Sequence, residues 1–358
     1  MYTPVAFSIV FYLFASLLVM AVVADSYTKK RLLNINENTA RYFYLIPLLL
    51  IILIGSRPVG EGGFIDSPMY KDFFRIADTY KVSPMKDKDL IFGYFILLTS
   101  YFTNYRGFFV ICGAISVVLA VLVSRSVSKK YWILFFIGHI ASLYYWNYNV
   151  FGLRQGLASA LFLYALFVKN KWWRAILMIM SFGTHFSLGL PILGYIITIF
   201  IGKVDKRMYG IWGLLIPISY FFGIKIEYTI AKLIPDIRTN YFIENIGEQV
   251  FRWDIIAYSF VILAISYYFI FVKKIKDVTY HRIVNVFIFA NTALLLLIRV
   301  NHAHRFAYLS WFLGSLVVFY PFFISDADGL KNKYKVFSQT VLAFFTFVVI
   351  HFIKITFF

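Results

Sequence analysis

The chain has 358 residues, of which 61% are hydrophobic, 21% aromatic and only 15% charged. This composition lies far outside the usage of soluble globular proteins and predicts an integral membrane protein. A net charge of +18 would suggest nucleic-acid binding in a soluble protein. In a membrane protein the distribution of charge over the loops matters more than its sum, so we expect no nucleic-acid partner.

Apolar runs recur along the chain and are separated by short charged loops. Because backbone groups in lipid must be hydrogen-bonded within their own segment, spanning runs of this kind are expected to be helices. We predict an all-α polytopic protein of about twelve transmembrane helices that form a single integral membrane domain over residues 1–358. The predicted spans are residues 4–24, 42–56, 107–124, 131–147, 153–168, 174–188, 190–201, 208–223, 255–272, 283–299, 306–324 and 336–354.

The basic residues of the loops predict the orientation of these spans. With both termini outside, every inner loop carries several lysines or arginines, beginning with Lys29–Arg31, and the positive-inside rule is satisfied loop by loop. This assignment requires that the short apolar run Leu90–Phe102 does not cross, so we expect an interfacial helix there. The main outer loops are then about residues 57–106 and 224–254, each long enough to carry short interfacial helices.

The first outer loop contains a pattern typical of an amphipathic helix. Asp66, Tyr70, Phe74 and Ala77 follow one another at spacings of three and four residues. A carboxylate and a phenol on one face of a helix can hydrogen-bond sugar hydroxyls. The alternative is that Asp66 only caps the helix, a role that aspartate often fills.

The stretch Asn147–Ser187 places Arg154 at the start of an apolar helix. A cation is unfavourable there unless an anion shares the site, because the helix macrodipole is already positive. Arg305 opens a later span on the same outer face, with Arg299 shortly before it, so the three arginines suggest one outward-facing pocket for a polyanion such as a diphosphate. The alternative is that each arginine merely reaches to the membrane interface.

The histidines give weaker signals. His185, near the outer end of a helix, is either hydrogen-bonded into the bundle or serves as an acid, a base or a sugar ligand. His302 and His304 form an HxH pair that lacks a third metal ligand. The triplets Asp87–Asp89 and Asp326–Asp328 resemble metal-binding pairs of soluble glycosyltransferases, but such triplets arise readily by chance and carry no weight here. We therefore predict neither a metal nor a cofactor.

Five motifs occur in order between Arg57 and Tyr308, namely IDSPMY, FGYFILL, NYNVFGLRQGLA, SFGTHFS and RFAY. Their order resembles that of the EpsG-like branch of the bacterial Wzy-type polysaccharide polymerases, with the RQ pair followed by the histidine as the most specific part. The resemblance implies a glycosyltransferase of the bacterial inner membrane that polymerises undecaprenyl-diphosphate-linked oligosaccharides into O-antigen or exopolysaccharide at the periplasmic face. Its implied partners are the lipid-linked donor and acceptor, the lipid bilayer, and the chain-length regulator and flippase of the pathway.

This chemistry fits the candidate residues. Transfer from a lipid diphosphate needs no nucleotide, and Arg154, Arg299 and Arg305 can stabilise the leaving diphosphate in place of a metal. The base that accepts the proton of the acceptor hydroxyl is either Asp66 or His185, which with Arg154 form the predicted catalytic set. The candidate sugar contacts are Tyr70, Gln155, Arg57, His302 and His304.

Two other functions are compatible with this sequence. A flippase or carrier for lipid-linked saccharides would need ionisable groups along a path through the bilayer, and such proteins frequently show repeated halves. Here the charges cluster on one face and no repeat is evident. A ligase that transfers finished polymer to a lipid core would share the arginine pocket.

Overall fold

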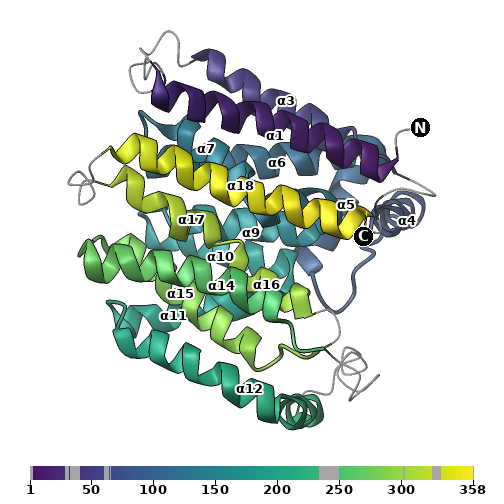
Figure 1. Ribbon diagram of the computed structural model, residues 1–358. Coiled ribbons are helices and arrows are strands. Elements are labelled where there is room, and N and C mark those ends of the chain that lie inside the picture. The colour runs from purple at the N-terminus through teal and green to yellow at the C-terminus, as the bar shows by residue number, and fades with distance from the viewer. Residues whose placement is uncertain are drawn as a thin grey trace. The chain divides into compact units, whose positions relative to one another are not determined.

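The computed structural model describes residues 3–28, 32, 41–59, 64, 66–233, 250–300, 303–324 and 332–357. The regular elements of these residues are all helices, which confirms the predicted all-α class (Figure 1). The chain divides into two compact units, one formed by Met1–Leu188 with Phe322–Phe358 and the other by Gly189–Pro321.

The first unit contains both the first and the last helix of the chain. Its elements are α1 (Pro4–Tyr27), η2 (Arg41–Tyr44), α3 (Leu45–Gly55), α4 (Ser67–Tyr80), α5 (Leu90–Ser100), α6 (Tyr105–Val127), α7 (Trp132–Ile140), α8 (Leu143–Trp146), η3 (Asn147–Phe151), α9 (Leu153–Ala165), α10 (Lys171–Thr184), η4 (Phe186–Leu188) and α18 (Lys333–Phe357). Figure 1 shows α1 and α18 side by side, and the two helices pack against each other.

The centre of the first unit is α9, which packs against α6 on one side and α10 on another. α10 also contacts α5, and α5 in turn contacts α4. α4 and α5 lie in the predicted first outer loop, and their inner faces meet α6 in a cluster of buried aromatic side chains that includes Tyr70, Phe74, Phe92 and Phe108. The loop is therefore held on the bundle by an apolar core of its own, which fixes the residues it carries.

The second unit is also helical. Its elements are α11 (Gly189–Ile201), α12 (Lys206–Leu233), α14 (Trp253–Tyr267), η6 (Tyr268–Val272), α15 (Val278–Leu295), α16 (Ala303–Trp311), α17 (Gly314–Phe319) and η7 (Tyr320–Phe323), at which the unit ends. α15 is its central helix, because α11, α12, α16 and α17 all pack against it. The predicted loop 224–254 begins as a continuation of α12, and most of the rest of that loop lies outside the described residues.

The described helices include five that are long and apolar enough to cross a membrane, namely α1, α6, α12, α14 with η6, and α18. A sixth is possible if α16 and the following α17–η7 segment, bent by 41°, count as one span. The predicted number of about twelve is not confirmed, because several predicted spans form shorter or interrupted helices. Residues 131–147, for example, contain α7 and α8 separated by a break at Ala141 and Ser142.

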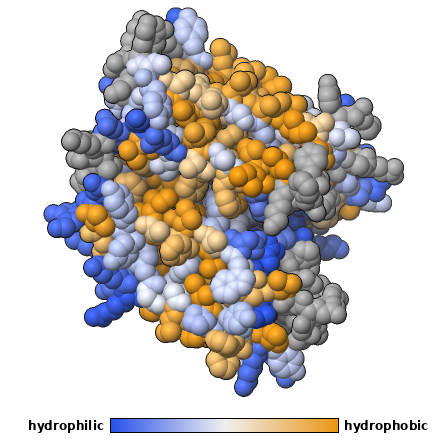
Figure 2. Space-filling view, viewed as in Figure 1, coloured by the Kyte–Doolittle hydropathy of each residue, from blue (hydrophilic) through white to orange (hydrophobic). Residues whose placement is uncertain are grey.

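The surface of the first unit supports a lipid environment. Apolar side chains cover much of α1 and α18 in Figure 2, and Leu13 and Leu17 of α1 are 60% and 73% exposed. Exposed apolar residues on this scale are unusual in soluble monomers and are typical of a face that meets lipid. α5 has only 11 residues, a length of about 16 Å at 1.5 Å per residue, which fits the expected interfacial helix.

Candidate functional site

Arg154 lies in the first turn of α9, as the sequence predicted. The π-helix η3 comes directly before it, and the N–H of Gly152 donates to the carbonyl of Asn147 at 2.9 Å. Gly152 stands at the N-cap and has no side chain to cap the helix. The positive end of α9 therefore carries a further positive charge, an arrangement that requires a nearby anion.

The anion is the carboxylate of Asp89, to which the sequence analysis gave no weight. Asp89 precedes α5 in a left-handed conformation, with φ 57° and ψ 36°, and its side chain does not cap that helix. Instead Oδ2 accepts a hydrogen bond from Arg154 Nη1 at 2.8 Å, and Oδ1 accepts one from the backbone N–H of Phe186 at 2.7 Å. The side chains of Asp89 and Arg154 are 8% and 23% exposed, so water screens this ion pair only partly.

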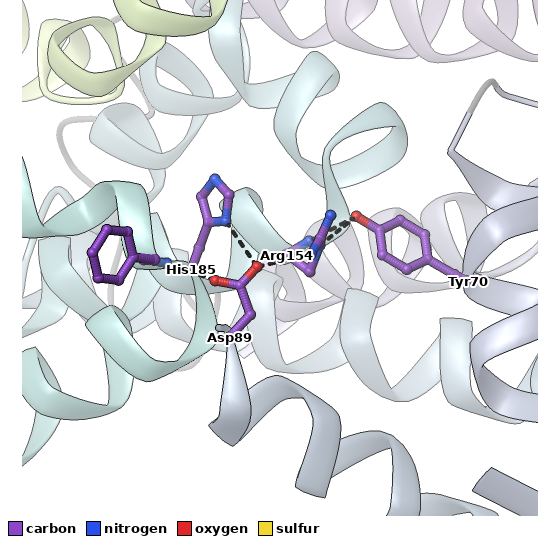
Figure 3. A network of polar contacts seen from close by, with 5 residues as sticks. Tyr70, Asp89, Arg154 and His185 are labelled. Carbon is purple, nitrogen blue, oxygen red and sulfur yellow. Dashed lines mark hydrogen bonds and ion pairs between the residues drawn. The ribbon is translucent and has the colours of Figure 1, made fainter. Parts of the chain in front are cut away.

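His185 approaches the same carboxylate from the end of α10 (Figure 3). It is the C-cap residue of that helix, and its own N–H donates to the carbonyl of Ser181. Its Nδ1 atom lies 3.6 Å from Asp89 Oδ2, a charge-contact distance that is longer than a formed hydrogen bond. The other ring nitrogen points away from Asp89 in Figure 3.

The environment of Asp89 decides its charge. Burial by itself raises the pKa of this carboxyl, but the nearby His185 imidazole, the Phe186 N–H and the Arg154 guanidinium together outweigh burial and hold the pKa below its usual value. Asp89 is therefore a carboxylate at neutral pH and the negative partner of Arg154.

Tyr70 of α4 contacts Arg154 from another side. Its hydroxyl oxygen accepts from Arg154 Nε at 3.4 Å, and its ring centre lies 5.8 Å from the guanidinium carbon. Burial raises the pKa of Tyr70, although Arg154 opposes this effect. The phenol therefore stays protonated and keeps its own O–H available as a donor.

Asp66 and Gln155 are the other two predicted residues near Arg154. Asp66 occupies the N-cap of α4 but makes no capping hydrogen bond, so the interpretation of Asp66 as a helix cap is not supported. Its charge acts on both Tyr70 and Arg154. The side-chain amide of Gln155 donates to the hydroxyl of Tyr148 at 3.4 Å, which ties α9 back to η3.

Arg57, a predicted sugar contact, is 4% exposed just after α3. Its Nε and Nη1 atoms donate to the carbonyls of Ile54 and Val150 at 3.1 and 3.0 Å, and its guanidinium lies over the ring of Phe109 at 5.0 Å. Burial lowers the pKa of Arg57 to about 10, which leaves it charged at neutral pH. These contacts join the end of α3 to η3, and a role in sugar binding stays a prediction.

Arg299 lies in the second unit and is also held by several groups. Its backbone N–H donates to Glu227 Oε1 at 2.8 Å, and its Nη2 donates to the carbonyl of Tyr220 at 2.9 Å. The guanidinium carbon lies 5.5 Å from the ring centre of Tyr220 and 5.1 Å from that of Phe251. Stacking between two aromatic rings is a stabilising position for arginine whether or not a ligand is present.

Arg305 and His304 belong to the first turn of α16. The ring of His304 meets the ring of Tyr308 edge-on at 5.7 Å between centres, and His302 lies outside the described residues. Since the two units are described separately, the convergence of the three arginines on one cavity stays a prediction. Within the described ranges, no group of three or more His, Cys, Asp or Glu side chains is arranged to hold a metal ion.

A protein-family model described as the EpsG family matches residues 40–358. No curated protein and no solved structure matches the chain. The matched segment contains all four residues of the polar cluster, which we call the Asp89 cluster: Tyr70, Asp89, Arg154 and His185.

Proposed function

The chain belongs to the EpsG family, and on that premise we propose that it polymerises undecaprenyl-diphosphate-linked oligosaccharide repeat units at the periplasmic face of the bacterial inner membrane. Membership of the family implies a multi-pass membrane protein of polysaccharide biosynthesis with a polymerase activity of the glycosyltransferase type. The observation that carries the more specific proposal is the buried carboxylate of Asp89, which contacts Arg154, the Phe186 N–H and His185.

Arg154 is the proposed ligand of the leaving diphosphate. Its hydrogen bonds use Nη1 toward Asp89 and Nε toward Tyr70. Among the described residues its Nη2 group makes no hydrogen bond, and the side chain is 23% exposed, so two N–H donors remain for phosphate oxygens. Because Asp89 fixes the guanidinium before substrate arrives, little reorganisation is needed when negative charge develops on the leaving group.

His185 is the proposed base. The carboxylate of Asp89 lies on the Nδ1 side of the ring, which favours a proton on Nδ1 and leaves Nε2 as the acceptor. The acceptor sugar hydroxyl then attacks the anomeric carbon of the donor, the bond from that carbon to the phosphate oxygen breaks, and Nε2 takes the hydroxyl proton. In this step the Asp89 carboxylate stabilises the imidazolium that forms.

Asp66 is the alternative base, since its charge acts on Tyr70 and Arg154. Tyr70 keeps its O–H and is the proposed donor to a sugar hydroxyl or a phosphate oxygen. We also retain Arg299 and Arg305 as further diphosphate ligands and Gln155, Arg57, His302 and His304 as sugar contacts, each of which requires a direct test.

The decisive assay uses purified protein, a lipid-diphosphate-linked repeat unit and a chelator, with products separated by length. We expect His185→Ala to reduce ladder formation about 10²–10⁴-fold, and Asp66→Asn to retain it. Wild-type ladders are expected to survive the chelator. Normal ladders from His185→Ala would contradict the assignment of His185 as the base. If His185→Ala forms few ladders but binds the lipid-linked unit normally, the loss lies in the chemical step.

Asp87 offers a matched control for Asp89, because it belongs to the same D-x-D triplet but is exposed. We expect Asp89→Asn to lose most of the activity and Asp87→Asn to keep it. If both variants fail and the chelator also stops the reaction, the triplet serves a metal and the arginine mechanism is wrong. Transfer of finished polymer to a lipid core without any ladder would indicate a ligase, and movement of the lipid-linked unit without new bonds would indicate a flippase.

The proposed topology of about twelve spans with both termini outside places the Asp89 cluster in the periplasm. Asn149, at the predicted outer turn, is only 6% exposed and is a poor site for labelling. The exposed positions Asp87 and Lys130 precede and follow α6 and are better suited. In a protein without Cys112, a cysteine at Asp87 should react with a membrane-impermeant thiol reagent in intact spheroplasts and one at Lys130 should not; the reverse pattern would invert the topology.

A further inference from the structure

A small buried cavity lies inside the first unit, between α6, the α7–η3 segment and α9. Its polar lining consists of Ser116, His139, Tyr144, Tyr145, Tyr148, Asn149 and Ser159. The space open to the centre of a water molecule is ≈ 20 Å³, which suffices for one water but not for a sugar. The same turn of α9 carries Arg154 of the Asp89 cluster, because the lining residue Gly156 follows Arg154 by two positions.

Three polar atoms at this cavity have no hydrogen-bond partner within the described part of the chain. They are Tyr145 Oη, Asn149 Oδ1 and Ser159 Oγ, and their residues are 2%, 6% and 2% exposed. The amide nitrogen of Asn149 is bonded to the carbonyl of Tyr145 at 2.8 Å, which holds the Asn149 side chain in place. Buried polar atoms in protein interiors nearly always have a hydrogen-bond partner, which is either a protein group or an ordered water.

We propose that the cavity is a binding site for an ordered water molecule that bridges Tyr145, Asn149 and Ser159. A water can donate to Asn149 Oδ1 and exchange hydrogen bonds with the two hydroxyls, which satisfies all three atoms at once. A metal cation does not suit the site, because no carboxylate lines it. A purely apolar occupant would leave the three polar atoms unsatisfied.

The position of this water gives it a role in the site. Asn149 belongs to η3 and Ser159 to α9, so the water links the π-helix to the helix whose first turn presents Arg154. π-helical turns within helices are frequent at functional sites and are held by their surroundings. The water is therefore a positioning element for Arg154, and this part of the inference rests on the proposed function.

Radiolytic footprinting of the purified full-length protein tests the water directly, because hydroxyl radicals formed from a bound water oxidise the side chains that touch it. Tyr280 is the matched control, being 0% exposed with its hydroxyl bonded to the carbonyl of Val317 at 2.9 Å. We expect Tyr145 to be oxidised several-fold faster than Tyr280. Equal or slower oxidation of Tyr145 would overturn the proposal whatever the activity of the protein.

A filled cavity provides the second arm. Ser159→Val places methyl groups where the water is proposed to bind, and we expect it to reduce oxidation of Tyr145 to the level of Tyr280. The control is Ser124→Val, since Ser124 is a buried serine of α6 whose hydroxyl is bonded to the carbonyl of Ala120. Fast oxidation of Tyr145 in the Ser159→Val variant would show that the water does not bind beside Ser159.

The activity of the same variants tests the positioning role. We expect Ser159→Val to lower the polymerisation rate several-fold, with little change in the substrate concentration that gives half the maximal rate, while Ser124→Val stays at the wild-type level. Wild-type rates in Ser159→Val would remove the positioning role but leave the water site standing. If wild-type protein forms no ladder at all, the proposed function fails, and the footprinting result still decides the water.

Discussion

Arg154 and Arg299 were predicted to serve the same diphosphate, but their surroundings differ in kind. Arg154 is paired with the carboxylate of Asp89, which directly precedes α5, and its Nη2 group makes no hydrogen bond among the described residues. The Arg299 side chain donates to a backbone carbonyl and lies near two aromatic rings, and its backbone N–H donates to Glu227. A carboxylate partner of a guanidinium can be exchanged for another anion, whereas a carbonyl and aromatic rings stabilise an arginine whether or not an anion binds. Two arginines that follow the same sequence pattern therefore have different neighbours, and whether both bind the diphosphate stays a prediction.

The largest expected effect separates the two arginines by the same substitution. Arg154→Lys should reduce chain extension about 10²–10³-fold, because lysine keeps the charge but loses the planar fork that aligns on phosphate and on Asp89. Arg299→Lys should reduce the rate of chain extension much less than Arg154→Lys. Product ladders from purified variants measure both rates, with the exposed Arg75→Lys on α4 as the control.

If Arg299→Lys reduces the rate of chain extension as much as Arg154→Lys, Arg299 also binds the diphosphate, as the sequence predicted. Wild-type ladders from Arg154→Lys would remove Arg154 from the diphosphate site and with it the basis of the comparison.

A smaller effect is expected from substituting two glycines. Gly156 packs against η3, the segment that precedes Arg154, and Gly223 packs against the side chain of Arg299. A Cβ at Gly156 would lie 2.4 Å from the carbonyl oxygen of Tyr148 in η3, whereas one at Gly223 would lie 3.2 Å from the flexible Cδ of Arg299. Gly156→Ala must therefore move backbone, and we expect it to destabilise the protein by about 1–3 kcal/mol and to slow polymerisation. Gly223→Ala should be close to neutral or stabilising, because alanine favours the helix.

Thermal unfolding of both variants in detergent measures this difference. A Gly156→Ala protein with unchanged unfolding and activity would show that η3 yields easily and does not position Arg154.

The smallest expected effect is the pH dependence of stability that comes from Asp89. Its folded pKa is lowered, so its stabilisation is complete above the ordinary aspartate pKa of about 3.9 and is lost as the pH falls through the lower folded value. The unfolding temperature of the wild type should therefore decrease in this acidic range, and that of Asp89→Asn should decrease less. Asp72→Asn, which changes an exposed carboxylate of α4, is the control. Parallel curves for wild type and Asp89→Asn would contradict a lowered pKa.

The helical class and several elements of the candidate site could be predicted from the sequence alone. Apolar runs and loop charges are local properties, and a backbone in lipid can satisfy its hydrogen bonds only as a helix or closed barrel. The adverse position of Arg154 at a helix start was also readable; the sequence predicted a diphosphate there, whereas the anion that the structure describes at Arg154 is Asp89. The motifs around Arg154 and His185 were sufficient to indicate the family that the chain matches over residues 40–358.

Only the tertiary structure decided which anion it is. Asp89 lies 65 residues from Arg154 and 97 from Phe186, and a D-x-D triplet contains nothing that reports such distant partners. The interruption of predicted spans was equally hidden, because a uniformly apolar run has no periodicity that marks a break such as the one between α7 and α8. Contacts between distant segments depend on how helices pack, and packing is a property of the folded chain that no single stretch of sequence carries.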